Sequence, residues 1–248
     1  MIRLCLIGIG TGNPRHLTLQ AVDAMNAADL ILIPRKAAAK ADLADLRHQM
    51  IADVLTNPAA RVVEFDLPVR DPAISDYSAR VAAWHQDIAR IWGKTIAAAL
   101  PQGGQVAVLI WGDPGLYDSS LRIAARLVQP TEITVIPGIT SMQALTASHA
   151  IALSGIGEAF TVTTGRNLRE GGFPPGCRSC VVMLDGACSF RALEPAGLTI
   201  WWAAYAGMAD EVRDCGPLAE AGPRIVTARA AARQKHGWIM DIYLLRRD

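Results

Sequence analysis

The sequence predicts an α/β protein built from two α/β halves. Up to about residue 152, short apolar segments of strand length alternate with longer segments of helical periodicity. This alternation is typical of a parallel sheet covered by helices on both faces. Beyond that point strand-like segments dominate, and the helical segments shrink to short connectors. We therefore expect two domains, residues 1–152 and 153–248, with a cleft between them as the ligand site.

The first half is expected to begin with a strand and then to alternate strand and helix. Thr18 is a suitable N-cap for the first helix, and Pro34 is expected to end the second strand. Pro101 and the Gly103–Gly104 pair terminate the long third helix. The expected elements, starting with a strand, are residues 2–9, 17–28, 30–33, 41–55, 62–65, 76–100, 105–111, 116–128, 133–136 and 139–149.

The second half is expected to contain strands joined by loops and short helices. The tract GGFPPG, residues 171–176, is a loop too short to separate an independent module. The expected strands are residues 160–164, 180–184, 198–204, 225–227 and 238–245.

The composition restricts the class of ligand and the compartment. The net charge is only +1, so the chain has no general basic field for nucleic acid, and anionic ligands must be met by local arginines. Its longest apolar stretches, residues 106–111 and 200–206, are far shorter than the roughly 20 residues that span a bilayer. No secretory signal is visible, and the five cysteines are odd in number. These features predict a reduced, cytoplasmic protein.

The glycine-rich segment GIGTGNP, residues 8–14, follows the first strand and resembles a dinucleotide-binding turn only superficially. Its glycines stand at every second residue, and Pro14 lies in the first turn of the expected helix, whereas the dinucleotide fingerprint is G-x-G-x-x-G. Asp29 precedes the next strand, but a ribose-binding acid belongs at a strand's end. We therefore do not expect NAD or NADP at this turn.

Two further glycine turns follow apolar strands and are candidates for a ligand site. Gly112 would let a ligand approach the backbone, and Asp113 can accept hydrogen bonds from exposed amides. An ordinary strand–helix turn with an Asx-type cap is an equally good interpretation of this motif alone. The second turn contains Gly138 and is followed by the hydroxyls of Thr140 and Ser141. Helix capping explains one of these hydroxyls, and the second favours a site.

The sequence gives little support for a metal site. Cys177 and Cys180 form a single C-x-x-C pair, with only Cys188 nearby, whereas a zinc site needs a second pair or suitably spaced histidines. The five histidines are scattered along the chain. We expect no metal.

Four segments together resemble the tetrapyrrole methylase family: GIGTGNPRHLT, IWGDPGLYDSSLRI, IPGITSMQAL and VVMLDG. The resemblance implies transfer of a methyl group from S-adenosylmethionine to a porphyrinoid precursor, with S-adenosylhomocysteine as the by-product. It also implies two α/β domains of the tetrapyrrole methylase type, the active site in the interdomain cleft, and a homodimer. The first glycine turn would then lie on the substrate side of the site.

Further segments narrow the resemblance within the family: ADLILIPRKAAAKADLADLR, TGRNL, VVMLDGACSFRAL and GWIMDIYLLRR. They are similar to members of cobalamin biosynthesis that methylate carbon 1 of precorrin-5 and release its acetyl group as acetate. Methylation of carbon 20 of precorrin-2 is an alternative, because that branch shares the PRK stretch. Methylation of ribosomal RNA is a second alternative, although an enzyme that binds RNA needs a basic surface, which this chain lacks.

The resemblance also assigns roles to individual residues. Trp111 replaces a glycine of the family pattern, so its side chain must point away from the cofactor. The residues implied to bind the cofactor are Trp111, Gly112, Asp113, Leu116, Thr140, Ser141, Met183, Tyr205 and Ala206.

A substrate with many carboxylates needs local cations, and loss of an acetyl group needs a base and an oxyanion donor. The expected substrate-binding residues are Gly10, Thr11, Arg15, Arg35, Lys36 and Arg166. For each cation, solvated surface charge is the alternative. The candidate catalytic residues are Asp113, Tyr117 and Asp118, and Asp113 has a purely structural role as its alternative.

Overall fold

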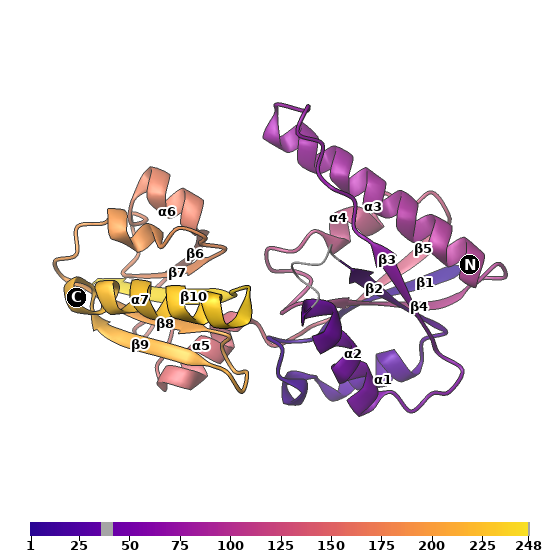
Figure 1. Ribbon diagram of the computed structural model, residues 1–248, viewed down its shortest axis with the longest axis horizontal. Coiled ribbons are helices and arrows are strands. Elements are labelled where there is room, and N and C mark those ends of the chain that lie inside the picture. The colour runs from indigo at the N-terminus through magenta and orange to yellow at the C-terminus, as the bar shows by residue number, and fades with distance from the viewer. Residues whose placement is uncertain (36–41, 248) are drawn as a thin grey trace. The chain divides into compact units, whose positions relative to one another are not determined.

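The computed structural model describes residues 1–35 and 42–247. The chain forms two compact units, Met1–Ile139 and Thr140–Asp248. Each unit contains one five-stranded sheet with helices packed on it (Figure 1). The α/β fold expected from the sequence is confirmed.

The first unit is built on a fully parallel sheet with the strand order β3-β2-β4-β1-β5. Its strands are β1 (Ile2–Gly8), β2 (Leu30–Arg35), β3 (Arg61–Asp66), β4 (Gly104–Ile110) and β5 (Thr131–Ile136). Its helices are α1 (Leu19–Asn26), α2 (Asp42–Val54), α3 (Tyr77–Ala99) and α4 (Ser120–Ala124), preceded by the 3₁₀ turn η1 (Pro14–His16).

Alternate residues of the central strands fill a separate core on each face of this sheet. On β1, Leu4 and Leu6 pack on the side covered by α3 and α4. Ile7, and Ile9 just beyond the strand, pack on the other side, against α1 and α2. This two-residue alternation explains why the strands appear in the sequence as continuous apolar runs.

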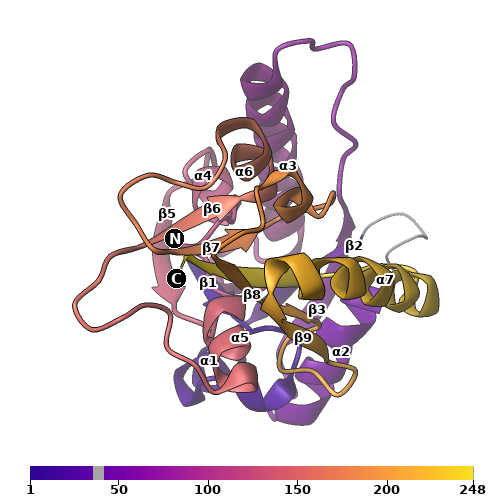
Figure 2. The same ribbon diagram turned by 90° about the vertical axis from the view of Figure 1, so that its left-hand side faces the viewer.

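The second unit has a mixed sheet with the strand order β6-β7-β10-β8-β9, in which only the pair β6–β7 is parallel. Its strands are β6 (Phe160–Thr164), β7 (Ser179–Met183), β8 (Leu198–Ala204), β9 (Val212–Pro217) and β10 (Asp241–Arg247). Its helices are α5 (Ser141–His149), α6 (Gly165–Gly171) and α7 (Leu218–His236), with the 3₁₀ turn η3 (Ser189–Ala192). Helices α5 and α7 belong to different cores of this unit, on the two faces of its sheet (Figure 2).

The division between the units falls at residues 139 and 140, whereas the sequence places it after residue 152. The physical reason is the packing of α5. Its buried residues Ala144 and Leu145 contact Ala203 of β8 and Leu244 of β10 in one apolar cluster. Helix α5 therefore belongs to the second sheet.

Two expected elements are wrong, and one observed strand was not expected. The strand expected at 225–227 lies inside the 19-residue helix α7, so the helices of the second half are not all short. The edge strand β9 is missing from the expected set. The helix expected over 116–128 forms only as α4, Ser120–Ala124.

The two errors in the second unit have identifiable physical causes. Ile225 begins a run of β-branched residues, but it is buried together with Leu218, Ala221 and Ala232, which recur at helical spacing. Strand β9 contains charged residues, a glycine and a proline, which are poor strand formers tolerated at an edge.

Within the described residues no helix is both long and apolar enough to span a membrane.

Candidate functional site

The first unit has a topological switch point between the neighbouring strands β1 and β4. The chain leaves β1 for α1 on one face of the sheet and leaves β4 for α4 on the other face. Ligands of open α/β sheets bind beyond the carboxyl ends of strands at such a point. Gly10 and Gly112 follow these two strands and form an isolated bridge, in which Gly112 N donates to Gly10 O at 2.7 Å. Both glycines have positive φ, +75° and +63°.

Three glycines pack backbone against backbone at this edge of the sheet. A Cβ atom added to Gly8 would stand 2.5 Å from Gly138 N and 2.8 Å from Gly112 O. A Cβ atom added to Gly138 would collide with the same Gly112 oxygen and with the Gly8 backbone. The ends of β1, β4 and β5 are therefore closer together than any residue with a side chain permits. This arrangement leaves main chain, rather than side chains, to meet a ligand.

Asp113 joins two of these turns through its carboxylate. Its Oδ1 accepts from Gly115 N at 2.7 Å, and its Oδ2 accepts from Gly138 N at 3.0 Å. Both oxygens are thus held by backbone amides, which favours the structural role that the sequence left open for this residue.

The rest of the loop after β4 holds the other candidate side chains. Leu116 is half-buried. Tyr117 has a left-handed backbone with φ +49° and a side chain that is 45% exposed. Asp118 Oδ1 accepts from Ser120 N at 2.6 Å, at the start of α4. A non-glycine residue with positive φ is strained, and such strain is often found at functional sites.

The side chain of Trp111 packs on the α1–α2 side of the sheet. The guanidinium of Arg47 lies over its ring, 4.9 Å from the ring centroid. Arg47 Nε also donates to Leu109 O at 3.2 Å, and burial lowers the pKa of Arg47 to about 10, so it remains charged at neutral pH. The Trp111 ring therefore has its own packing site.

Sequence reasoning missed Arg47. It lies three residues from Ala44 and three from Met50, both buried, and so it occupies the apolar face of α2. A single arginine at helical spacing between apolar residues was the sequence signal that could have indicated its burial.

The expected substrate residues of the first unit occupy three different settings. Thr11 is buried, and its Oγ1 lies 3.0 Å from His16 Nδ1. Arg15 is exposed in η1. Arg35 is exposed at the end of β2 and pairs with Asp66 at 2.9 Å and with Glu64 at 3.4 Å, so a substrate carboxylate would compete with these acids.

Lys36 lies outside the described residues. Arg166 is exposed near the start of α6, whose N-cap is Thr164.

In the second unit, Met183 and Tyr205 lie at the same edge of the sheet. Strands β7 and β8 both pair antiparallel with β10, so they run in the same direction and their carboxyl ends flank the start of β10. The residue after Met183 is Leu184, which has φ +54° and is 67% exposed. Tyr205 has φ +52°, and its N–H donates to Met240 O at 2.8 Å. Two non-glycine residues are thus held in the left-handed region where the strands end.

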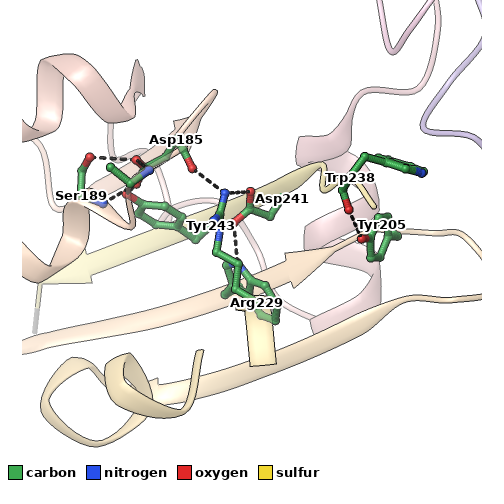
Figure 3. Close-up of polar contacts among 9 residues, drawn as sticks. Asp185, Ser189, Tyr205, Arg229, Trp238, Asp241 and Tyr243 are labelled. Atoms are coloured by element: carbon green, nitrogen blue, oxygen red, sulfur yellow. Dashed lines mark hydrogen bonds and ion pairs between the residues drawn. The ribbon is translucent and has the colours of Figure 1, made fainter. Parts of the chain in front are cut away.

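The side chain of Tyr205 is buried and does not offer its ring to a ligand. Its hydroxyl donates to Trp238 O at 2.6 Å (Figure 3). Its ring packs on the rings of Trp238 and His236. Ala206 is also buried, in the core next to α5. The cofactor contacts expected of these residues would therefore be made by main-chain atoms.

Thr140 and Ser141 begin α5. Thr140 is the N-cap, with a capping box: Met142 N donates to Thr140 Oγ1 at 3.2 Å, and Thr140 N donates to Gln143 Oε1 at 3.1 Å. Capping thus accounts for the hydroxyl of Thr140. Ser141 is half-buried in the first turn.

No group of three or more histidine, cysteine or acidic side chains within residues 1–35 and 42–247 is placed to hold a metal ion. All five cysteines, including Cys177 and Cys180, are free thiols.

This geometry defines an α/β protein with candidate ligand sites at the ends of its strands, formed largely by backbone. Residues 3–222 match the family model of the tetrapyrrole (corrin/porphyrin) methylases, and the chain belongs to this family.

Individual relatives agree with this assignment. The chain is 46% identical over 251 residues to precorrin-6A synthase [deacetylating] of Sinorhizobium sp, covering 100% of this chain and 96% of that protein. It is 31% identical over 143 residues to precorrin-2 C(20)-methyltransferase of Sinorhizobium sp, covering 56% and 55% of the two chains. Among solved structures, the putative cobalamin synthesis related protein CobF from Corynebacterium diphtheriae has a TM-score of 0.83 and 37% identity, covering 100% of this chain and 99% of that one.

Proposed function

We propose that the chain is an S-adenosylmethionine-dependent C-methyltransferase of cobalamin biosynthesis. It methylates carbon 1 of precorrin-5 and releases the acetyl group of that carbon as acetate, which gives precorrin-6A. The observation that carries this proposal is the 46% identity to the deacetylating precorrin-6A synthase over the full chain. The precorrin-2 C(20)-methyltransferase matches only 56% of the chain, so carbon-20 methylation is less well supported.

The strand ends of both units suit a cofactor with an amino-acid end and an adenosine end. S-adenosylmethionine supplies an electrophilic methyl group when it is bound. In the first unit, Gly8, Gly112 and Gly138 pack backbone against backbone, and we place the amino-acid end of the cofactor against the main chain of Trp111, Gly112 and Asp113 beside them. Leu116, Thr140 and Ser141 would complete the contacts at the amino-acid end.

The adenosine would be held by residues of the second unit. Met183 offers a half-buried side chain, whereas Tyr205 and Ala206 offer main chain. Methyl transfer to a ring carbon needs alignment above all, and orientation can contribute about 7–11 kcal/mol to lowering such a barrier.

Removal of the acetyl group needs a second kind of help. Water adds to the acetyl carbonyl, the bond between carbon 1 and the acetyl carbon breaks as acetate leaves, and its electron pair passes into the macrocycle, which makes carbon 1 nucleophilic toward the methyl group. The proton lost by water needs a base, and the developing oxyanion needs a donor. Asp113 accepts backbone N–H groups on both carboxylate oxygens, whereas Asp118 accepts from Ser120 N on Oδ1. Tyr117 has a half-exposed phenol on a strained backbone. We therefore place Tyr117 first as oxyanion donor and Asp118 first as base.

The carboxylates of the substrate would be met by cations near the strand ends. Arg15 and Arg166 are exposed, and we propose them together with Lys36, Gly10 and Thr11 as substrate contacts. Arg35 would have to exchange Asp66 for a substrate carboxylate.

We further propose a cytoplasmic homodimer. The free cysteines support a reducing compartment. The edge strand β5 supports a partner copy, because Ile133 and Val135 are exposed on it. Sedimentation equilibrium tests the dimer, and a monomer at micromolar concentration contradicts it.

The function is tested by incubation with a precorrin-5-generating system and methyl-labelled cofactor. We expect labelled product and acetate in equal amounts. Labelled product without acetate would point to another carbon of a tetrapyrrole. Cofactor binding without any turnover would indicate a binding protein.

A further inference from the structure

A buried polar network lies next to the strand ends that carry Met183 and Tyr205. Its centre is the carboxylate of Asp185, which is 5% exposed (Figure 3). This carboxylate accepts from Tyr243 Oη at 2.7 Å, Ser189 Oγ at 2.8 Å, Ser189 N at 2.5 Å and Ala187 N at 3.0 Å. Four donors saturate its oxygens, so Asp185 is equipped to hold a loop rather than to move a proton.

The charge of Asp185 is maintained by the same contacts. Burial by itself raises the pKa of this carboxyl, but the hydrogen bonds from Tyr243, Ser189 and Ala187 outweigh it, and the pKa is lowered. Asp185 is therefore ionised at neutral pH, which strengthens each of its hydrogen bonds.

Arg229 of α7 extends the network to the other strand end. Its Nη2 donates to the main-chain oxygen of Asp185 at 3.1 Å, and its Nε donates to Asp241 Oδ2 at 2.8 Å. Asp241 starts β10, and its Oδ2 also accepts from Trp202 Nε1 of β8 at 3.0 Å. One chain of hydrogen bonds thus joins the residues after β7, the start of β10 and the last residues of β8.

The two residues at these exits have backbones that need such support. Leu184 precedes Asp185, and Tyr205 follows Trp202 by three residues; both have left-handed φ. A non-glycine residue remains in that region only where its surroundings hold it. The α6 side adds a steric restraint, because a Cβ atom at Gly165 would collide with the Asp185 side chain.

We infer that Asp185, Tyr243, Arg229 and Asp241 form a positioning network that fixes the exits of β7 and β8, and thereby sets the affinity for the adenosine half of the cofactor. This inference rests on the proposed function. None of the four residues is a catalytic residue, since each acts through the backbone next to Met183 or Tyr205. The network is expected to govern cofactor binding and to leave the methyl-transfer step unchanged.

The test replaces Tyr243 with phenylalanine. Tyr243→Phe removes one donor to Asp185 and retains the ring that packs edge-on against Phe190 at 5.3 Å. We expect binding of S-adenosylhomocysteine, measured by calorimetry, to weaken roughly tenfold, as for loss of a hydrogen bond to a buried charge. The KM for S-adenosylmethionine should rise by a similar factor, with kcat at saturation unchanged.

Ile225→Val is the matched control. It removes one methylene from the same core, where Ile225 is fully buried, and it breaks no hydrogen bond. It should lower the melting temperature while leaving cofactor affinity at the wild-type value. If Ile225→Val weakens binding as much as Tyr243→Phe does, general loosening explains the effect and the inference is wrong.

Ser189→Ala provides a second variant should Tyr243→Phe not fold. It deletes the hydroxyl that donates to Asp185 and accepts from Arg169 Nη1 at 3.2 Å, keeps the backbone donor Ser189 N, and is expected to give a smaller shift in the same direction. Wild-type affinity in a folded Tyr243→Phe or Ser189→Ala protein overturns the inference alone. Failure of the wild-type protein to bind S-adenosylhomocysteine overturns the proposed function instead.

Discussion

Replacing Gly138 with alanine should destabilise the first unit and disrupt the proposed binding site for the amino-acid end of the cofactor. The added methyl group would collide with the oxygen of Gly112 and with the backbone of Gly8. Gly138 has no positive φ, so its backbone conformation is acceptable for alanine and the penalty is purely steric. All the clashing atoms belong to main chain, which cannot rotate away as a flexible side chain can.

The magnitude follows from the cost of overpacking. Forcing a methyl group into a filled site costs about 1–3 kcal/mol, which lowers the Tm by roughly 2–12 °C for a protein of this size. Relief requires the ends of β1, β4 and β5 to separate. Because the hydrogen bond from Gly138 N to Asp113 spans two of these strand ends, it should lengthen or break. Denaturant unfolding gives the free energy, and calorimetry with S-adenosylmethionine gives the affinity.

Gly171→Ala is the control for this experiment. Gly171 is the last residue of α6, has no positive φ and has no neighbour within 4 Å of an added Cβ atom. Alanine there should be neutral or stabilise the protein by up to about 1 kcal/mol. If Gly138→Ala unfolds at the wild-type denaturant concentration and binds the cofactor normally, the close packing of the three glycines is refuted.

Three further predictions concern other parts of the first unit. Burial is the main cause that lowers the pKa of His85, and nearby arginine charges lower it further. The folded state therefore favours the neutral imidazole. This stabilisation should be complete above the usual His pKa of about 6.5 and be lost as the pH falls below it. His85→Gln should flatten this loss in urea titrations between pH 7.5 and 5.5, and an unchanged slope would assign the loss to other groups. Arg47→Met leaves the oxygen of Leu109 without this donor and Trp111 without its cation, and should cost about 1–3 kcal/mol in urea unfolding; a neutral result would show that water replaces the guanidinium. Tyr117→Phe should slow acetate release and, because carbon 1 can take a methyl group only after its bond to the acetyl carbon has broken, methyl transfer by the same factor, with affinity for S-adenosylmethionine unchanged; wild-type rates of acetate release and methyl transfer would contradict its proposed role.

The first unit was largely predictable because its local signals agree with its packing. Apolar runs bounded by glycine and proline gave the five parallel strands, and Thr18 and Asp76 cap the helices they precede. The glycine turns were visible as candidate ligand loops. Their contact with one another was not, because the collision at Gly8 and Gly138 depends on which strands are neighbours.

The second unit was less predictable because long-range contacts override its local preferences. Ile225 has strand propensity but is buried in a helix, and the alternating edge strand β9 has too few strand formers to be recognised. The network around Asp185 was also invisible, since Asp185, Arg229 and Tyr243 are far apart in the sequence. The short segment VVMLDG was recognised by resemblance, and its physical role becomes clear only when the donors to its aspartate are known.

The strand ends of the first unit and those of the second unit are held in place by different physical interactions. Different substitutions should therefore disrupt them. At Gly8, Gly112 and Gly138 the backbone is held by close packing without side chains, so the site should resist changes of salt and pH and be sensitive to any added carbon atom. At Leu184 and Tyr205 a strained backbone is held by hydrogen bonds to buried charges, so deletion of a single donor should matter more than a small change of volume. Cofactor analogues altered in the methionine part should thus be rejected by sterics, whereas affinity for adenosine itself should follow the integrity of the network. Measuring adenosine and methionine separately as ligands of the two variants distinguishes the two cases. Gly138→Ala should weaken methionine binding and keep adenosine binding, whereas Tyr243→Phe should weaken adenosine binding roughly tenfold and keep methionine binding. Loss of both fragments in both variants would mean that the two strand ends act as one unit.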